Sequence, residues 1–287
     1  MPRVALASAR GLDPMDQDEG VLAPALAARG VDVAVVPWDE PGADWGAFDL
    51  VLVRSTWDYD DQRDAFVAWA ERVGTLTTLR NPAEVVRWNT HKGYLLELEE
   101  RGAPIVPTAW LGAGDRVVLD DLLADRGWTD AVVKPTVGAG ARGLSRVRPG
   151  DAAGQVALDA LLARGDVMVQ PFVADVTSAG ELSVIVLDGR VSHAVNKVPA
   201  PGDIRIQIEH GGTYRVVEPD ADTVALAEWI VSSTGQDLLY ARVDLLPDGV
   251  GGWMLGELEA TEPSLYLRWS EAGTGRLADL VVRAAGG

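Results

Sequence analysis

At 287 residues, of which 47% are hydrophobic, the chain is long enough for about two domains with substantial cores. It carries 43 Asp and Glu against 25 Lys and Arg, a net charge of −18. A field of that sign repels phosphate backbones and anionic headgroups, so nucleic acids and membranes are not expected partners. Cysteine is absent and the three histidines are scattered, which excludes disulfides, a thiolate nucleophile and a Cys- or His-based metal site and leaves oxygen ligands for any metal.

The N-terminus shows no targeting signal. It reaches Asp13 and Asp16 without the apolar core and cleavage site of a signal peptide, and no window approaches the ~18 to 20 apolar residues of a membrane span. We therefore expect a cytoplasmic protein.

Lysine is rare in this chain. Of the 25 basic residues 22 are Arg, and the three Lys are Lys92, Lys134 and Lys197. Since Arg serves the ordinary basic positions, each Lys is a candidate for a role that needs a compact point charge. The alternative is a codon bias that leaves three Lys by chance.

The first part of the chain predicts a parallel sheet. Short apolar strands are expected at 3–8, 31–36 and 48–54, and helices at 20–29 and 61–74. Strands that alternate with helices are typical of an α/β unit whose ligands bind at the carboxyl ends of the strands. Residues 54–59 follow such an end. Asn81 and Pro82 then break the chain, so we place the first domain at 1–86.

Two further units are expected. Residues 87–175 predict a small α+β unit, with helices at 91–102, 119–127 and 151–165 and strands at 103–111, 129–135, 144–148 and 166–173. Residues 176–287 predict a mostly antiparallel unit, with a hairpin at 181–195 that turns at Asp188 and Gly189, a helix at 220–234 and strands at 238–246 and 251–260.

A glycine-rich turn follows the strand at 129–135. Gly138, Gly140 and Gly143 match the dinucleotide pattern G-x-G-x-x-G, but that pattern must open a helix, whereas residues 144–148 have the alternation of a strand. We interpret the turn as the tip of a hairpin whose backbone amides close over phosphates while Lys134 points at them. Two alternatives stay open: an incidental mobile hairpin, and an NAD-dependent oxidoreductase.

Three acidic residues are expected on one sheet face. Glu257 and Glu259 are two apart on one strand and project together, and Asp244 on an adjacent antiparallel strand lies opposite them. Such carboxylates repel one another unless cations bridge them, and hard oxygen ligands suit Mg²⁺ held jointly with nucleotide phosphates. A solvated outer face is the alternative.

A loop at 196–212 combines basic residues with glycine. It contains Lys197, Arg205, Gln207, Gly211 and Gly212. In an acidic protein this segment forms a local region of positive electrostatic potential that attracts an anionic group. An ordinary surface loop is the alternative.

In this order, these segments resemble the ATP-grasp superfamily, in its glutathione-synthetase-like branch of carboxylate–amine ligases, over nearly the whole chain. The resemblance implies a Rossmann-like N-terminal domain, a small lid subdomain and a C-terminal, mostly antiparallel subdomain. It also implies a ligase that uses ATP and two Mg²⁺ ions, proceeds through an acyl phosphate and releases ADP and phosphate. The metal ligands would be Asp244, Glu257 and Glu259, with Glu259 in place of the commoner Asn.

The same resemblance implies roles for other residues. Lys92 and Lys134 correspond to phosphate-binding lysines, and Glu181 to an acidic residue next to the nucleotide. The backbone of Gln170, Phe172 and Val173 would hold the adenine and Asp175 the ribose, below the turn that contains Gly138 and Gly140. The implied catalytic residues are Lys197, Arg205 and Gln207, of which Arg205 stabilises the γ-phosphate and the acyl phosphate.

The segment RSTWDYD at 54–60 points to the substrate. It offers Arg54 for a carboxylate, Asp58 for an ammonium and Trp57 or Tyr59 as walls, a set suited to a small zwitterionic amino acid, with ordinary loop packing as the alternative. Ser55 and Gly212 complete the expected substrate site.

Together with NTHKGYLLELEERG and GELEATEPSLYL, this segment resembles the ATP-grasp cyclo-ligases of antibiotic biosynthesis that close O-ureido-D-serine to D-cycloserine. Two alternatives stay open: a ligase that joins two amino acids, and a nucleotide-binding relative without catalysis. A homodimer, common in such ligases, is also open, although core packing accounts for most of the ten Trp as well as an interface does.

Overall fold

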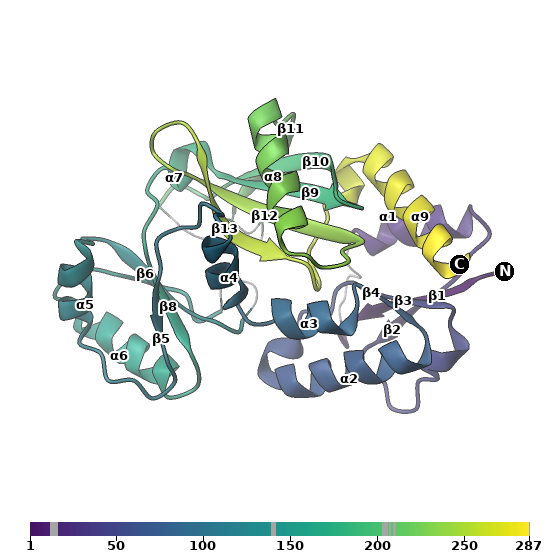
Figure 1. Ribbon diagram of the computed structural model, residues 1–287, viewed down its shortest axis with the longest axis horizontal. Helices are drawn as coiled ribbons and strands as arrows, with labels where there is room; N and C mark the ends of the chain where they lie inside the picture. Colours follow the sequence, from purple (N-terminus) through teal and green to yellow (C-terminus); the bar gives the residue numbers. More distant parts are fainter. Residues whose placement is uncertain (12–16, 139–141, 203–205, 207, 209–210, 287) are drawn as a thin grey trace.

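The computed structural model describes residues 1–11, 17–138, 142–202, 206, 208 and 211–286, and it contains three sheets flanked by helices (Figure 1). Both expected fold classes are present: an α/β unit at the N-terminus and α+β units after it. None of the helices within these residues is long and apolar enough to cross a membrane.

The N-terminal sheet is parallel, as the sequence predicts. Its order is β2-β1-β3-β4, with β1 (Arg3–Ser8), β2 (Asp32–Pro37), β3 (Leu50–Val53) and β4 (Thr78–Arg80). Helix α1 (Glu19–Ala27) packs on one face and α2 (Arg63–Leu76) on the other. The prediction missed β4, because three residues are too few for a periodic signal, and α3 (Ala83–Asn89), which starts directly after the proline that we treated as a break. Two 3₁₀ turns, Trp45–Ala47 and Tyr59–Gln62, complete this unit.

The central unit contains an antiparallel sheet. Its order is β5-β8-β6-β7, with β5 (Ala109–Leu111), β6 (Ala131–Pro135), β7 (Ser145–Val147) and β8 (Val167–Pro171). Helices α5 (Leu119–Arg126) and α6 (Ala152–Leu162) pack on it, and α4 (Tyr94–Glu100) precedes it. Because β7 pairs antiparallel with β6, the glycine-rich turn joins two strands and opens no helix. The hairpin interpretation is therefore confirmed.

The C-terminal sheet is antiparallel and follows the order β11-β10-β9-β12-β13. Its strands are β9 (Glu181–Leu187), β10 (Arg190–Val198), β11 (Thr213–Val217), β12 (Tyr240–Pro247) and β13 (Trp253–Glu259). The predicted turn is confirmed, since both Asp188 and Gly189 have positive φ, as a two-residue hairpin loop requires. Helices α7 (Val176–Ala179) and α8 (Ala221–Ser233), a 3₁₀ turn (Leu267–Trp269) and α9 (Glu271–Gly286) complete the fold. The sequence analysis missed β11 and α9.

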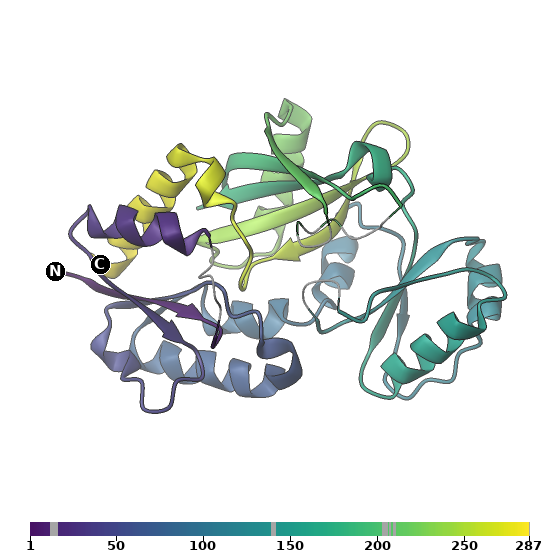
Figure 2. The ribbon, with the colours of Figure 1, turned by 180° about the vertical axis from the view of Figure 1, so that it is seen from behind.

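The C-terminal sheet touches both other units (Figures 1 and 2). Helix α9 packs on α1 in one apolar cluster, so the end of the chain lies against the N-terminal unit. Asn81, expected only as a break, is fully buried and its amide donates to the carbonyl oxygens of Tyr240 and Ala260, at 2.9 and 2.7 Å. On the other side, Ile105 bridges to Leu255 of β13. The exact domain boundaries at 86 and 175 stay predictions.

Candidate active site

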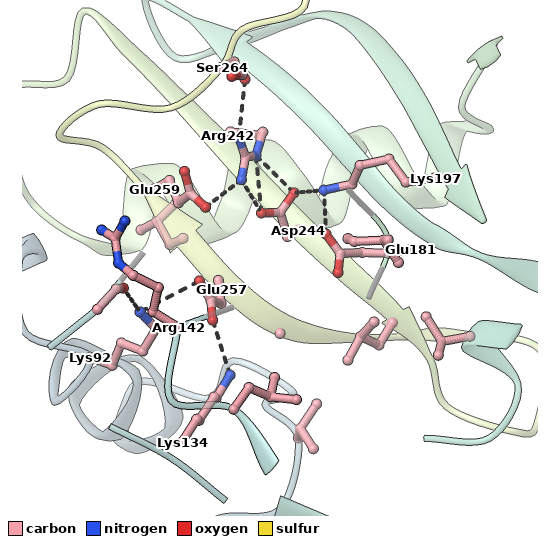
Figure 3. Close-up of a pocket in the computed structure, with 18 of the residues that line it drawn as sticks. Lys92, Lys134, Arg142, Glu181, Lys197, Arg242, Asp244, Glu257, Glu259 and Ser264 are labelled. Atoms are coloured by element: carbon pink, nitrogen blue, oxygen red, sulfur yellow. Dashed lines mark hydrogen bonds and ion pairs between the residues drawn. The ribbon is translucent and has the colours of Figure 1, made fainter. Parts of the chain in front are cut away.

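A cavity of about 950 Å³ lies where the three units meet. The N-terminal unit contributes Trp57 and Tyr59, and the central unit contributes Lys92 and Lys134. Acidic and basic side chains of the C-terminal sheet form the remaining polar wall: Glu181, Lys197, Arg242, Asp244, Glu257 and Glu259 (Figure 3). The sheet face that the sequence left undecided is therefore a cavity wall and not a solvated surface.

Two of the three lysines meet one carboxylate. Lys134 Nζ lies 3.0 Å from Glu257 Oε1, and Lys92 Nζ lies 3.8 Å from Glu257 Oε2. Lys92 also donates to the carbonyl oxygen of Gly138 at 2.8 Å, which ties it to the glycine-rich turn. Burial raises the pKa of Glu257, but Lys92 and Lys134 outweigh it and hold the pKa below its ordinary value, so the carboxyl group is ionised.

The third lysine belongs to a buried ionic network. Lys197 Nζ lies 2.5 Å from Glu181 Oε1 and 3.4 Å from Asp244 Oδ1. Burial raises the pKa of Glu181 to about 7, against the opposing effect of Lys197. Arg242 holds Asp244 through bonds of 3.0 Å (Nε to Oδ1) and 2.9 Å (Nη2 to Oδ2), and it also pairs with Glu259. Although burial opposes it, Arg242 and Lys197 keep the pKa of Asp244 well below its ordinary value.

Strand register explains why these side chains meet. In the pairing of β12 with β13, Asp244 lies opposite Glu257 and Arg242 opposite Glu259, as predicted for the carboxylates. Residues two apart on a strand share a face, so Arg242 accompanies Asp244. The sequence analysis missed Arg242, although its position two residues before Asp244 was a usable signal.

The three carboxylates do not converge in this structure. In the part of the chain that the structure describes, no group of three His, Cys, Asp or Glu is arranged to hold a metal ion. Each predicted ligand is instead engaged by a basic side chain, so Lys and Arg supply the bridging cations that the sequence analysis required. The donor chemistry fits Mg²⁺, which prefers carboxylate oxygens, provided that these carboxylates exchange protein cations for the ion.

The expected nucleotide residues are mostly in place. Gly138, Gln170, Phe172 and Val173 line the cavity. The side chain of Gln170 donates to Thr108 Oγ1 at 2.9 Å, and the Arg146 guanidinium lies 3.8 Å from the centre of the Phe172 ring. Asp175 differs: it precedes α7 and does not line the cavity. Gly140 lies outside the described residues.

The expected substrate residues divide into two groups. Trp57 and Tyr59 line the cavity as walls, whereas Arg54, Ser55 and Asp58 do not. The charge pair proposed for a zwitterion is therefore wrong as a direct contact. Asp58 Oδ1 accepts a hydrogen bond from Trp38 Nε1 at 2.8 Å, which turns the carboxylate into the N-terminal unit.

Arg54 is fully buried behind the cavity wall. Its Nη2 donates to the carbonyl oxygen of Pro263 at 3.2 Å and lies 3.8 Å from Asp18 Oδ2. Ser55, equally buried, donates to the Glu19 carboxylate. Arg54 therefore joins the N-terminal unit to the loop after β13, whereas Ser55 packs within the N-terminal unit, and both correspond to the loop-packing alternative.

The glycine-containing loop is only partly described. Arg205 and Gln207 lie outside the described residues, while Ile206 and Ile208 line the cavity. Gly212 does not line it. Lys197, the remaining predicted catalytic residue, has its ammonium group between Glu181 and Asp244. In this arrangement it organises the carboxylates.

Arg142 and Glu262 are two further cavity residues without a role in the sequence analysis. Arg142 reaches from the glycine-rich turn to the N-terminal unit, where its Nη2 donates to the carbonyl oxygen of Trp57 at 3.0 Å. Glu262, in the loop after β13, is 9% exposed, and burial raises its pKa to about 8. Arg142 lies at the end of the glycine-rich turn and Glu262 within the segment GELEATEPSLYL, but neither segment assigned a role to these side chains, so the three-dimensional structure identifies them.

Comparisons with known proteins agree with this geometry. The model of the D-cycloserine synthetase DcsG N-terminal domain matches residues 4–81, and that of the prokaryotic glutathione synthetase ATP-grasp domain matches residues 114–264. The cycloserine biosynthesis protein DcsG of Streptomyces lavendulae is 34% identical over 279 residues, which cover 92% of this chain and 93% of that protein.

Solved structures lead to the same group. The crystal structure of D-cycloserine synthetase DcsG matches with a TM-score of 0.89 and 31% identity over 99% of both chains. The ATP-grasp ligase PsnB, solved with a minimal precursor, Mg and ADP, matches with a TM-score of 0.64 and 17% identity over 99% of this chain and 98% of that one, a likeness of fold alone. The fold expected from the sequence is confirmed, and the oxidoreductase alternative is wrong.

Proposed function

Since this chain belongs to the ATP-grasp family of ATP-dependent ligases, we propose that it activates the carboxylate of one small amino acid and closes that molecule on itself, converting O-ureido-D-serine to D-cycloserine. The observation that supports this choice of substrate is the match of residues 4–81 to the N-terminal domain of a D-cycloserine synthetase. That unit supplies the Trp57 and Tyr59 walls, whereas the nucleotide residues are shared by ligases of many substrates.

Lys92 and Lys134 bind the phosphates of ATP in this proposal. Their ammonium groups converge on Glu257 from the central unit, directly below the turn that contains Gly138. Compact positive charges at this point neutralise the charge that develops on the departing ADP. The adenine then lies toward Gln170, Phe172 and Val173, and the register of β6 with β8 places Gln170 on the same sheet face as Lys134.

Asp244, Glu257 and Glu259 would hold Mg²⁺. Bound Mg²⁺ neutralises phosphate oxygens and orients them. The charge balance supports two ions: Lys92, Lys134, Lys197 and Arg242 offset Glu181, Asp244, Glu257 and Glu259, so the wall is already neutral. A nucleoside triphosphate carries as much negative charge as two divalent cations carry positive charge, and such a complex leaves the balance unchanged.

The reaction then has two displacements. A carboxylate oxygen of the substrate attacks the γ-phosphorus, and the bond between that phosphorus and the bridging oxygen breaks, leaving its electron pair on ADP. The ureido nitrogen next to the oxygen attacks the acyl carbon and loses its proton, and phosphate departs as the ring closes. Addition of one water releases the carbamoyl group as carbon dioxide and ammonia. Arg242 faces the cavity between Asp244 and Glu259, where its positive charge stabilises the negative charge of both displacements.

Mass analysis tests the proposal directly. The protein is incubated with ATP, Mg²⁺ and either O-ureido-D-serine or D-alanine, and nucleotide and amino-acid masses are read together. We expect ADP, phosphate and a lighter cyclic product from O-ureido-D-serine alone. A heavier condensed product would identify a ligase of two amino acids, and the lack of ADP formation with either substrate would contradict the proposal. The Glu257→Gln variant serves as the control for contaminating ATPase activity.

A further inference from the structure

We propose that Glu262 recognises the α-ammonium group of the amino-acid substrate, between walls formed by Trp57 and Tyr59. The inference rests on the proposed function and assigns the contact that the sequence analysis gave to Asp58. Asp58 is turned away from the cavity, toward Trp38, and Glu262 lines it.

The backbone on both sides of Glu262 is held in place from other parts of the chain. Each carbonyl oxygen of residues 261–265 accepts a hydrogen bond from a side chain that is distant in the sequence, at 2.8 to 3.2 Å. The donors, in order, are Tyr240, Trp57, Arg54, Arg242 and His193. A backbone fixed in this way sets the direction of the Glu262 side chain before substrate arrives.

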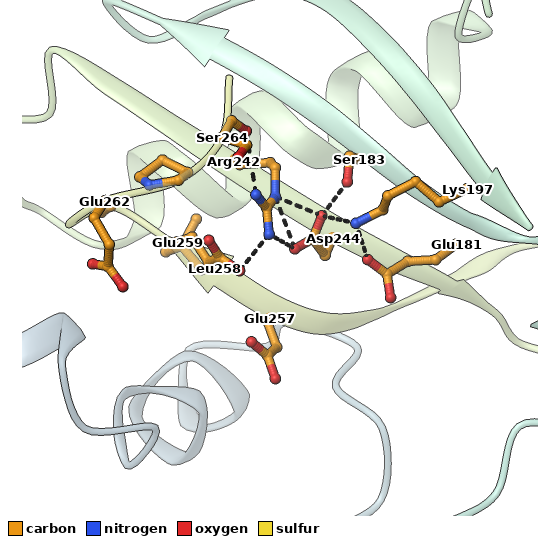
Figure 4. Close-up of polar contacts among 12 residues, drawn as sticks. Glu181, Ser183, Lys197, Arg242, Asp244, Glu257, Leu258, Glu259, Glu262 and Ser264 are labelled. Atoms are coloured by element: carbon orange, nitrogen blue, oxygen red, sulfur yellow. Dashed lines mark hydrogen bonds and ion pairs between the residues drawn. The ribbon is translucent and has the colours of Figure 1, made fainter. Parts of the chain in front are cut away.

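Glu262 differs electrostatically from the other acids of the cavity wall. Glu181, Asp244, Glu257 and Glu259 each pair with Lys or Arg, whereas no ion pair among the described residues includes Glu262. The Tyr59 hydroxyl is close enough to lower the pKa of this carboxyl group against the effect of burial. Figure 4 shows it apart from the Arg242–Asp244 network, beyond Glu259. A buried acid without a basic partner, which faces a cavity, fits a cationic ligand group.

The chemistry of the substrate matches this position. Its carboxylate must reach the phosphate end of the cavity, and its ammonium is attached to the adjacent carbon. Lys92 and Arg242, from the two sides of the phosphate end, are both near enough to affect the pKa of Glu262. Trp57 and Tyr59 line the cavity with Glu262, and Trp57 Nε1 donates to the carbonyl oxygen of Glu262 at 3.0 Å, which places an aromatic ring beside this acid.

The test combines a variant with a substrate analogue. Glu262→Gln keeps the shape but cannot form the carboxylate that a bound ammonium group would stabilise, and 3-(ureidooxy)propanoic acid is O-ureido-D-serine without the amino group. We expect wild type to prefer the amino compound in kcat/KM by about 10- to 100-fold, the range of a charge-assisted hydrogen bond. In Glu262→Gln, KM for the amino compound should rise by about the same factor, and most of the preference should disappear. Thermal stabilisation by ADP with Mg²⁺ should stay unchanged, which shows that the variant is folded. The exposed Glu100, changed to Gln, is the matched control.

Three other outcomes would each contradict the inference. A Glu262→Gln enzyme with wild-type KM and wild-type preference would show that the ammonium binds elsewhere. A lower kcat with unchanged KM and preference would assign Glu262 to proton transfer. If wild type forms no cyclic product from O-ureido-D-serine, the proposed substrate fails, and the inference fails with it.

Discussion

Arg142 and Asp60 form an ion pair with 2.6 Å between Nη2 and Oδ2. Because Arg142 follows the glycine-rich turn and Asp60 follows β3, the pair joins the nucleotide side of the cavity to the substrate side. The same guanidinium donates to the carbonyl oxygen of Trp57. Arg142 therefore holds the Trp57 wall of the cavity in place.

Removing this link should affect the amino acid more than the nucleotide. We expect Arg142→Ala to raise KM for the amino-acid substrate about 3- to 10-fold, since a partly exposed ion pair contributes on the order of 1 kcal/mol. Water entering the less closed cavity should also increase the ADP formed per molecule of product. Steady-state kinetics with both products quantified checks this. Arg148→Ala is the control, because Arg148 lies beyond the same hairpin and pairs with Asp130; an equal change in that variant would show that the effect is not specific to the link.

Replacing Arg54 tests whether this residue stabilises the fold or binds the substrate. It is fully buried and donates to the carbonyl oxygen of Pro263, next to Glu262. We expect Arg54→Met to lower the free energy of unfolding by about 3–5 kcal/mol, because it removes one partner of a buried charged contact with Asp18. Urea unfolding measures this. The exposed Arg3→Met should change stability by less than about 1 kcal/mol. A substrate contact would instead leave stability unchanged and raise only KM.

Much of the fold was predictable from the chain because its elements are long and periodic. The β9–β10 hairpin and strands β12 and β13 follow from alternation and turn residues, and the register that brings Asp244 opposite Glu257 follows from the period of two. Short elements such as β4 lack that signal. Helix α9 was missed although it has an apolar stripe, which packs on α1 at the other end of the sequence.

Site residues that belong to motifs were predictable from the sequence. Residues whose role depends on the direction in which one side chain points were not. Lys92, Lys134 and the carboxylates reached the cavity as expected. Sequence alone placed Arg54 and Asp58 near the substrate, because they follow a strand end, but tertiary hydrogen bonds turn both away. Glu262 shows the opposite: it lies in the segment GELEATEPSLYL without an expected role, and the structure places it in the cavity wall.

Glu257 is the better position for testing metal binding. Asp244 is 4% exposed and pairs with both Arg242 and Lys197. Asp244→Ala therefore removes one of the two carboxylate partners of each buried cation and should cost about 3–5 kcal/mol of stability. Glu257 has a partly accessible side chain and keeps a hydrogen-bonding group as Gln. We expect Glu257→Gln to retain wild-type folding and lose most of the additional thermal stabilisation that Mg²⁺ gives to bound ADP. Undiminished Mg²⁺-dependent stabilisation would exclude Glu257 as a ligand.

The pKa of Glu262 makes the stability of the wild-type protein depend on pH. Burial raises this pKa from 4.5 to about 8, Glu259 adds to the shift, and Tyr59, Lys92 and Arg242 oppose it. A carboxyl group with a raised pKa stabilises the folded state while it is protonated, so its contribution is complete below about pH 4.5 and is lost as pH rises through about 8. The amide side chain of the Glu262→Gln variant cannot ionise, so the free energy of unfolding of this variant should increasingly exceed that of wild type from pH 5 to pH 8. Each pKa unit corresponds to about 1.4 kcal/mol, so this difference in the free energy of unfolding grows by at most about 5 kcal/mol. Urea unfolding of wild type, Glu262→Gln and Glu100→Gln at both pH values measures it. A difference between wild type and Glu262→Gln that stays constant across this range would show that the Glu262 carboxyl group is ionised throughout.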